Sequence, residues 1–235
     1  MRKEAIFIPG LLCTGDLFGP QREGLSDLLE MAIGDHRRHA TLGETAQDIL
    51  SGAPERFVLA GLSMGGYISF EIMRRAGERV QALVLMDTTA RPDTPEQSRF
   101  RRELIATARS EGLEPVIDML LPKFLAPENA RKPEIAGVVR RMARETGVEA
   151  FCRQQEMIMA RPDARAALGE ITCPTLVIVG AQDALTPPEL AEEIAGHIAG
   201  ARLEVIPDAG HLATIENPAG VTAAIRSFLE AASGR

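Results

Sequence analysis

An α/β fold with a mostly parallel β-sheet is expected for this chain, because short apolar runs alternate with helical patterns along most of its length. Most of the runs are continuously apolar, which is typical of strands that helices cover on both faces. The runs occupy residues 5–8, 57–60, 82–86, 175–179 and 203–206. The helical patterns occupy residues 45–50, 67–75, 188–198 and 218–232. This alternation implies that right-handed crossovers join the strands.

Residues 91–165 interrupt the alternation. They carry helical patterns but no convincing strand, and turn-forming prolines recur in them at Pro115, Pro122, Pro127 and Pro133. The segment holds 14 basic and 12 acidic residues, whereas the whole chain has a net charge of −7. We therefore expect a core of residues 1–90 and 166–235, with a helical cap of residues 91–165 inserted over one end of the sheet. The alternative is a set of solvated helices packed on the flank of the sheet.

Composition and charge restrict the possible partners. With 45% hydrophobic and 25% charged residues, the chain is expected to be a soluble globular protein. No apolar stretch approaches about 18 residues and no cleavable leader is recognisable, so neither membrane insertion nor secretion is expected. The negative net charge and the lack of a basic tract argue against nucleic acid. Three cysteines without a CxxC pair favour free thiols in a reducing cytoplasm and argue against a zinc site.

A glycine-rich turn follows the second apolar run. The residues Gly61-Leu62-Ser63-Met64-Gly65 have the form G-x-S-x-G and lie between a predicted strand and a predicted helix. In such a strained turn the serine hydroxyl is lifted clear of the backbone, and strand and helix pass too close for flanking side chains to fit. A chance match is the alternative for any motif this short. The strand and helix around it favour Ser63 as a nucleophile.

A serine hydroxyl needs a general base, and four histidines are candidates. His36 and His39 lie in a polar stretch where a solvated surface is expected, and His197 lies in a helical pattern and is expected to be exposed. His211 follows the last apolar run. Because catalytic groups gather at the carboxyl ends of parallel strands, His211 is the expected base. A structural histidine in a turn is the alternative.

The group that orients this histidine is expected in a similar loop. Asp183 lies in the turn between the run 175–179 and the next helical pattern. Asp87 follows the run 82–86 and is its rival. Either aspartate could simply form a turn or cap a helix. Asp183 is preferred because it completes the chain order serine, aspartate, histidine that this architecture requires.

Negative charge that develops on a substrate needs hydrogen-bond donors. The first strand ends at Ile8-Pro9-Gly10-Leu11-Leu12, and a backbone N–H of this loop is expected to join that of Met64 in an oxyanion hole. No cofactor and no metal are expected to take part.

With these residues the chain resembles the α/β-hydrolase superfamily over nearly its whole length. The matching segments are Gly61-Leu62-Ser63-Met64-Gly65-Gly66, Gly180-Ala181-Gln182-Asp183, Gly210-His211-Leu212 and Glu216-Asn217-Pro218. The chain is most similar to small bacterial carboxylesterase-type members with a helical cap. The resemblance implies the α/β-hydrolase fold, which usually has eight strands. Here the chain begins at what resembles the third, so that about six strands are implied.

The oxyanion loop departs from the family pattern, because many members carry His-Gly where this chain has Pro9-Gly10. By position the resemblance places the loop donor on Leu11, with Leu12 as the alternative. Dehalogenases are excluded, since they resemble this pattern with aspartate as the nucleophile and hold halide with tryptophan, whereas this chain has Ser63 and no tryptophan. Lyases, C–C bond hydrolases, cofactor-free haloperoxidases and receptor-like binding modules remain as alternatives.

We therefore expect a serine hydrolase that cleaves a small carboxylic ester through an acyl-enzyme intermediate. Ser63 would attack the carbonyl, His211 would transfer the proton and Asp183 would orient the imidazole. The substrate pocket is expected to be lined by apolar residues of the predicted cap, namely Phe124, Phe151 and Met157. Apolar residues at helical spacing could also belong only to the core. Arg161 or Arg165 could meet a substrate carboxylate or form a structural ion pair. The acyl and alcohol groups, the choice between ester, thioester and lactone, and the oligomeric state stay open.

Overall fold

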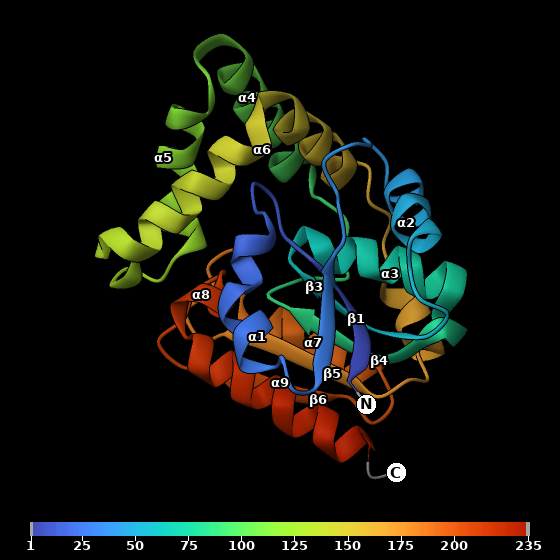
Figure 1. Ribbon diagram of the computed structural model, residues 1–235. Helices are drawn as coiled ribbons and strands as arrows, with labels where there is room; N and C mark the ends of the chain where they lie inside the picture. Colours follow the sequence, from blue (N-terminus) through green and yellow to red (C-terminus); the bar gives the residue numbers. More distant parts are fainter. Residues whose placement is uncertain (1, 234–235) are drawn as a thin grey trace.

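The computed structural model describes residues 2–233, and these residues contain a six-stranded β-sheet in which all strands run parallel (Figure 1). The strands are β1 (Lys3–Ile8), β2 (Leu29–Ile33), β3 (Phe57–Leu62), β4 (Val80–Met86), β5 (Thr175–Gly180) and β6 (Arg202–Ile206). They lie side by side in the order β2-β1-β3-β4-β5-β6. The predicted α/β fold with about six strands is thereby confirmed.

Strand β2 is the one that no apolar run indicated. It lies at the edge of the sheet and pairs with β1, from Lys3 opposite Leu29 to Phe7 opposite Ile33. Its side chains alternate between more and less exposed positions. An edge strand with this pattern lacks the continuous apolar run of a strand that is covered on both faces.

Helices cover both faces of the sheet (Figure 1). On one face lie α1 (Gly19–Gly24) and α9 (Pro218–Ser233), which contact each other, and the short α8 (Ala213–Glu216) leads into α9. On the other face lie α2 (Leu42–Ser51), α3 (Met64–Ala76) and α7 (Pro188–His197). These three helices share a face because their right-handed crossovers all progress in the same direction along the sheet.

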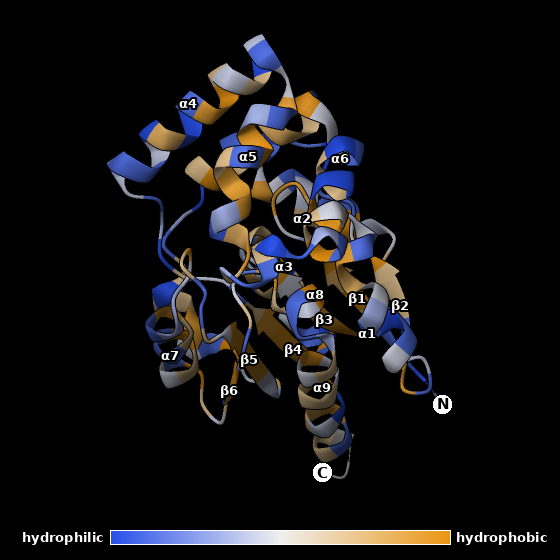
Figure 2. Ribbon diagram, turned by 90° about the vertical axis from the view of Figure 1, so that its left-hand side faces the viewer, coloured by the Kyte–Doolittle hydropathy of each residue, from blue (hydrophilic) through white to orange (hydrophobic). Residues whose placement is uncertain are grey.

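The core lies between the sheet and these helices. Every residue of β3 and of β5 is buried, and Figure 2 shows the strands in orange, enclosed by helices whose outer sides are bluer. On β1, the Phe7 ring meets the Phe18 ring edge to face, with centroids 5.1 Å apart. This packing fixes the ends of the central strands relative to one another, and the loops that follow those ends carry the candidate functional residues.

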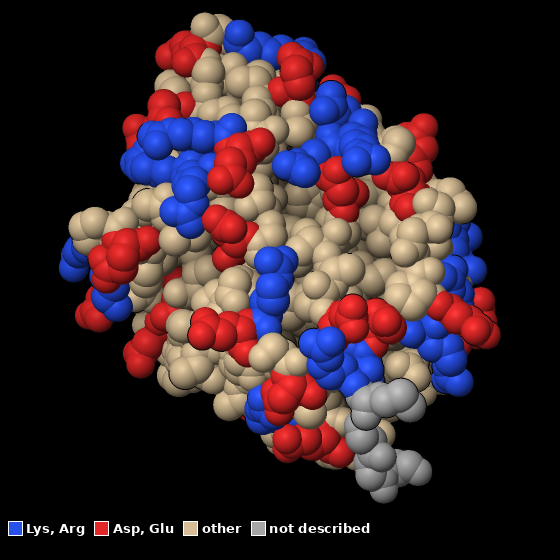
Figure 3. All heavy atoms as spheres, viewed as in Figure 1, with Lys and Arg blue, Asp and Glu red and all other residues tan. Residues whose placement is uncertain are grey.

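Three helices stand between β4 and β5 in the chain, namely α4 (Pro95–Glu111), α5 (Leu113–Phe124) and α6 (Pro133–Met159). They form a helical block beyond the end of the sheet, above it in Figure 1, and residues 91–165 contain no strand. Helix α6 is broken at Gly147, which has a φ of 77°. On the face drawn in Figure 3, Lys and Arg side chains alternate with Asp and Glu over this block. One ion pair of the block joins Arg140 and Asp118 at 2.6 Å.

Three features of the described residues concern membranes, metal ions and disulfides. Within residues 2–233 no helix is both long and apolar enough to cross a bilayer. The same residues bring no three His, Cys, Asp or Glu side chains together in a group that could hold a metal ion. Cys13, Cys152 and Cys173 are free thiols. Burial raises the pKa of Cys13 to about 12, so this thiol stays protonated at neutral pH.

Candidate active site

Ser63 occupies a sharp turn between β3 and α3. Its backbone has a φ of 53° and a ψ of −113°, which strains any residue that bears a side chain. The turn brings the chain so close to itself that a Cβ atom at Gly61 would overlap the carbonyl oxygen of Gly65. A Cβ atom at Gly65 would overlap the carbonyl oxygen of Ile8 on β1. Gly61 and Gly65 are therefore both required, because the backbone segments pass too close for a side chain at either position. The Ser63 side chain between them is partly exposed.

Ser63, His211 and Asp183 form one hydrogen-bonded chain. Ser63 Oγ lies 2.8 Å from His211 Nε2, and His211 Nδ1 lies 2.8 Å from Asp183 Oδ2. Because a carboxylate only accepts hydrogen bonds, Nδ1 carries the imidazole proton and Nε2 is free to accept the serine proton. His211 and Asp183 are each 3% exposed. The structure thus brings together the three residues that the sequence singled out, with His211 and Asp183 buried and Ser63 partly exposed.

Local donors hold Asp183 in place. Its Oδ1 accepts hydrogen bonds from the N–H groups of Leu185 at 2.8 Å and Thr186 at 3.0 Å. Its Oδ2 also accepts from the Thr186 hydroxyl at 2.7 Å. Burial raises the pKa of this carboxyl, but the charge and hydrogen bond of His211 and the bonds from Thr186 outweigh burial and keep the pKa below its ordinary value. Asp183 is therefore ionised at neutral pH.

Asp87, the rival aspartate, lies beyond the end of β4 and has the opposite electrostatics. Its Oδ1 accepts the N–H of Gly180 at 2.8 Å, and its Oδ2 has no hydrogen-bond partner among residues 2–233. Burial and the nearby charge of Asp183 raise the pKa of Asp87 well above its ordinary value. A buried carboxyl of this kind holds its proton, whereas an imidazole needs an ionised partner.

One carboxylate, that of Glu216, holds the loop after β6. Its Oε1 accepts the N–H groups of Gly210 at 2.9 Å and Leu212 at 3.2 Å. Its Oε2 accepts the N–H of Ala126 at 2.7 Å and the amide of Asn129 at 2.9 Å. Because Ala126 and Asn129 follow α5, this side chain ties the histidine loop to the helical block. In the sequence Glu216 stood out only as part of a motif, since nothing there shows which N–H groups face it.

The loop after β1 and the start of α3 supply the main-chain donors near Ser63. The N–H of Leu12 donates to Gln154 Oε1 at 3.1 Å and is therefore occupied. Of the two loop donors considered, this leaves Leu11. Met64 is the first residue of α3, where N–H groups have no carbonyl of their own helix to bind. Leu11 and Met64 are thus the two candidates for an oxyanion site.

His36 is buried, which corrects the expectation of a solvated surface. It is 2% exposed, and its Nδ1 accepts a hydrogen bond from Gln154 Nε2 at 3.0 Å. Burial lowers the pKa of His36 to about 4, so the imidazole is neutral at pH 7. Its neighbours Arg37 and Arg38 are exposed, as the polar stretch suggested. Only the fold shows that His36 turns inward to support Gln154, which in turn holds the oxyanion loop.

This burial predicts a pH dependence of stability. The folded protein holds His36 neutral down to about pH 4, whereas the unfolded chain protonates it near 6.5. Between these values the unfolded state binds more protons, so the free energy of unfolding falls as the pH is lowered. From pH 7 to pH 5 this residue is expected to cost about 2 kcal/mol. Urea unfolding at both pH values should show that the free energy of unfolding falls less in His36→Asn than in the wild type. The asparagine keeps an acceptor for Gln154. His197→Asn, which changes an exposed histidine, should lose as much as the wild type.

A cavity of about 400 Å³ opens at Ser63 and His211. Its apolar lining from the helical block comprises Phe100, Leu104, Leu120, Phe124 and Ile158. The Phe124 ring is also stacked on the His211 imidazole, with ring centroids 6.1 Å apart. Phe124 thus lies in the wall of this cavity, where the sequence predicts a pocket residue.

Phe151 and Met157 do not line the cavity, which corrects the expectation for both. They are fully buried elsewhere. Met157 faces the core, where its Sδ is 4.0 Å from Thr45 Oγ1 on α2.

A second cavity, of about 450 Å³, shares Tyr67, Thr89, Arg91 and Arg161 with the first. Neither Ser63 nor His211 lines it. Because the hydrogen-bonded chain opens only into the first cavity, we place the candidate active site there.

A parallel α/β sheet with serine, histidine and aspartate in loops at the carboxyl ends of its strands is typical of α/β hydrolases. Comparison with known proteins supports the same class. Residues 6–224 match the model of the alpha/beta hydrolase family, and the protein belongs to that family. The resemblance drawn from its motifs is thereby confirmed.

Relatives of known sequence or structure make the comparison more specific. The chain is similar to a thermophilic esterase from Thermogutta terrifontis, solved with malate bound, at a TM-score of 0.92 and 33% identity, with 98% of this chain and 90% of that chain covered. It is 26% identical over 181 residues to a pimeloyl-acyl-carrier-protein methyl ester esterase of Neisseria meningitidis, covering 73% of this chain and 69% of the relative. It is 32% identical over 186 residues to a Mycobacterium tuberculosis protein named for a non-heme bromoperoxidase activity, covering 77% and 70%.

Proposed function

We propose that the protein is a serine hydrolase that cleaves a small carboxylic ester through an acyl-enzyme intermediate. The observation that carries the proposal is the hydrogen-bonded chain from Ser63 through His211 to Asp183 at the wall of a cavity. The relatives that are named as esterases support the choice of an ester as substrate.

Each residue has a role that follows from its contacts. His211 Nε2 takes the Ser63 proton as Oγ attacks the ester carbonyl, and Asp183 stabilises the imidazolium that forms. The N–H groups of Leu11 and Met64 bind the oxyanion. His211 then protonates the departing alcohol, and a water molecule activated by the same imidazole releases the acid. The reaction needs no metal and no cofactor.

In the same proposal, the helical block is a cap that selects the substrate. Residues 91–165 act as a cap on a core of residues 1–90 and 166–235, because α4, α5 and α6 supply much of the wall opposite Ser63, including Phe124. The cap then sets which small-molecule esters fit. The three free cysteines support a cytoplasmic location, where thiols stay reduced.

A fluorophosphonate probe tests the nucleophile. The probe is expected to modify Ser63 and to abolish hydrolysis of p-nitrophenyl butyrate, and Ser63→Ala should remove both labelling and turnover. Ser51→Ala, which changes an exposed serine of α2, should keep both. Labelling at another residue, or turnover that survives in Ser63→Ala, would show that a different group is the nucleophile.

A haloperoxidase is the second candidate, because one relative is named for a bromoperoxidase activity. The same preparation can be assayed for bromination of monochlorodimedone with hydrogen peroxide and bromide. Bromination that is faster than the hydrolysis of every ester tested would favour this candidate over the esterase.

A further inference from the structure

The catalytic cavity carries cationic side chains, and no Asp or Glu of residues 2–233 lines it. Its charged lining consists of Arg91, Arg101, Lys123 and Arg161. This contrasts with the chain as a whole, which has a net charge of −7. Arg91 already forms an ion pair with Glu193 at 2.9 Å, outside the cavity wall. The charge that matters most for a bound ligand is therefore that of the more buried pair, Arg101 and Arg161.

Arg101 and Arg161 share a single carboxylate. Asp93 Oδ2 accepts from Arg101 Nε at 2.8 Å, and Asp93 Oδ1 is paired with Arg161 Nη1. The Asp93 and Arg161 side chains are 1% and 4% exposed, and that of Arg101 is 19% exposed. Two positive charges and one negative charge are thus held away from water. This leaves one positive charge without a counter-charge among the described residues, an arrangement that is costly unless an anion completes it.

Gln155 adds an unsatisfied donor at the same place. Its Oε1 accepts a hydrogen bond from Arg101 Nη1 at 2.9 Å. Because a guanidinium only donates, this bond fixes which end of the amide is the oxygen. The Nε2 group therefore points the other way, and it is buried without a partner among the described residues. Gln155 is fully buried and belongs to the cavity lining, and a buried amide N–H group without a partner is costly unless an acceptor reaches it.

The geometry is also rigid before any ligand binds. Arg161 donates from Nε to the Arg91 carbonyl at 2.9 Å and from Nη1 to the Ile158 carbonyl at 3.0 Å. Its guanidinium lies over the Tyr67 ring, 4.5 Å from the centroid. Side chains held in this way lose little freedom on binding, which is what a specificity site requires.

We propose that the substrate is an ester that also bears a free, ionised carboxylate, and that Gln155 Nε2 and the Arg101–Asp93–Arg161 cluster bind that carboxylate. This rests on the proposed ester hydrolysis at Ser63 and names its substrate class. A carboxylate has two acceptor oxygens and supplies the missing negative charge. A neutral side chain on the substrate could satisfy Gln155 but would leave the guanidinium charge unbalanced.

Matched pairs of esters test the proposal. p-Nitrophenyl hemiglutarate is compared with p-nitrophenyl pentanoate for a carboxylate on the acyl side, and carboxymethyl butyrate with methoxyethyl butyrate for one on the alcohol side. In at least one pair, kcat/KM for the anionic ester is expected to exceed that for the neutral ester by about tenfold or more, as charge-assisted hydrogen bonds allow. Neutral esters preferred in both pairs would overturn the proposal.

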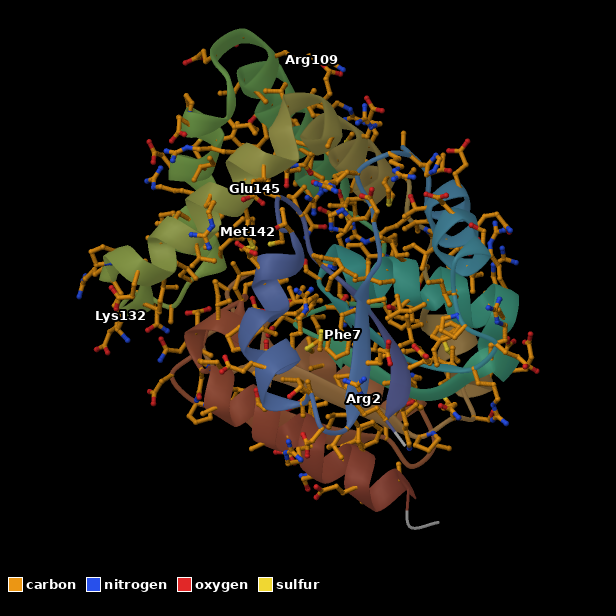
Figure 4. The ribbon with its side chains drawn as sticks, viewed as in Figure 1. Arg2, Phe7, Arg109, Lys132, Met142 and Glu145 are labelled. Carbon is orange, nitrogen blue, oxygen red and sulfur yellow. The ribbon has the colours of Figure 1, made fainter. Side chains whose placement is uncertain are left out.

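Variants locate the carboxylate site. Gln155→Glu keeps the shape and the bond to Arg101 but places a negative charge in the cavity, and it should lower kcat/KM for the preferred anionic ester by about tenfold or more. The loss is expected to be smaller for the matched neutral ester, so the ratio of the two kcat/KM values should fall. Arg101→Gln should act in the same direction. Arg109→Gln is the control, because it removes the same charge from the same helix at its exposed outer end, away from the cavity (Figure 4).

Binding to an inactive protein separates this inference from the hydrolase itself. Glutarate is titrated calorimetrically into Ser63→Ala, and binding is expected that Gln155→Glu abolishes and Arg109→Gln preserves. If neutral esters are hydrolysed while glutarate does not bind and anionic esters gain nothing, the inference is overturned and the hydrolase stands. If no ester is hydrolysed but glutarate binds through Gln155, the carboxylate site stands and the proposed function fails.

Discussion

Replacing His211 with glutamine is expected to lower kcat for an activated ester by about 10⁴- to 10⁶-fold, the range seen when the base of a serine nucleophile is removed. The structure gives the reason. Ser63 Oγ has His211 Nε2 as its hydrogen-bond partner at 2.8 Å, and a glutamine amide cannot accept a proton at neutral pH. Substrate binding should change little, because the cavity wall stays largely intact.

Stopped-flow release of p-nitrophenol measures this loss. The wild type should show an initial burst proportional to protein concentration, and the burst should vanish in His211→Gln. His197→Gln is the control, since His197 is an exposed residue of α7 whose Nδ1 lies 2.7 Å from its own helix at the Glu193 carbonyl. A receptor-like module would bind the ester with no burst in any of the three proteins.

The candidate triad could be predicted because its geometry is encoded locally. Ser63, Asp183 and His211 each follow a strand within a few residues, and parallel strands bring their carboxyl ends to one edge of the sheet. The glycines around Ser63 are required by contacts within a few residues and with the neighbouring strand, and such constraints leave a visible motif.

The supports of the triad could not be predicted in the same way. His36, Gln154 and Leu12 are far apart in the sequence, and their hydrogen bonds exist only once α6 lies against the loop after β1. The charged neighbours of His36 favour a surface position, but the fold buries it. A single residue that turns inward has no periodic signal in an irregular stretch.

The sequence also could not show which residues of the helical block face the cavity. Helical periodicity identifies Phe151 and Met157 as buried, but it does not show which part of the protein buries them. Conversely, Gln155 reads as an ordinary polar residue of a helix. Its role as a buried donor depends on Arg101 from α4 occupying its oxygen, a contact between residues 54 positions apart in the chain.

The same substitution should have very different effects on kcat at the two buried aspartates. Asp183→Asn is expected to lower kcat by about 10⁴-fold. The N–H groups of Leu185 and Thr186 both donate to Asp183 Oδ1, so the asparagine oxygen stays there and its NH₂ group faces His211. Nδ1 must then accept a hydrogen bond, the proton moves to Nε2, and the imidazole can no longer accept the proton of Ser63.

Asp87→Asn, by contrast, should leave kcat within about threefold of the wild type, because a protonated carboxyl and an amide have the same charge and nearly the same shape. The raised pKa of Asp87 also sets the sign of the effect on stability. A carboxyl whose pKa is higher in the folded state favours folding at low pH and loses that contribution as the pH rises. At pH 7 the Asp87→Asn protein should therefore be at least as stable as the wild type in urea unfolding. A large loss of kcat in Asp87→Asn with normal unfolding, together with an active Asp183→Asn, would mean that Asp87 is the partner of His211 during turnover.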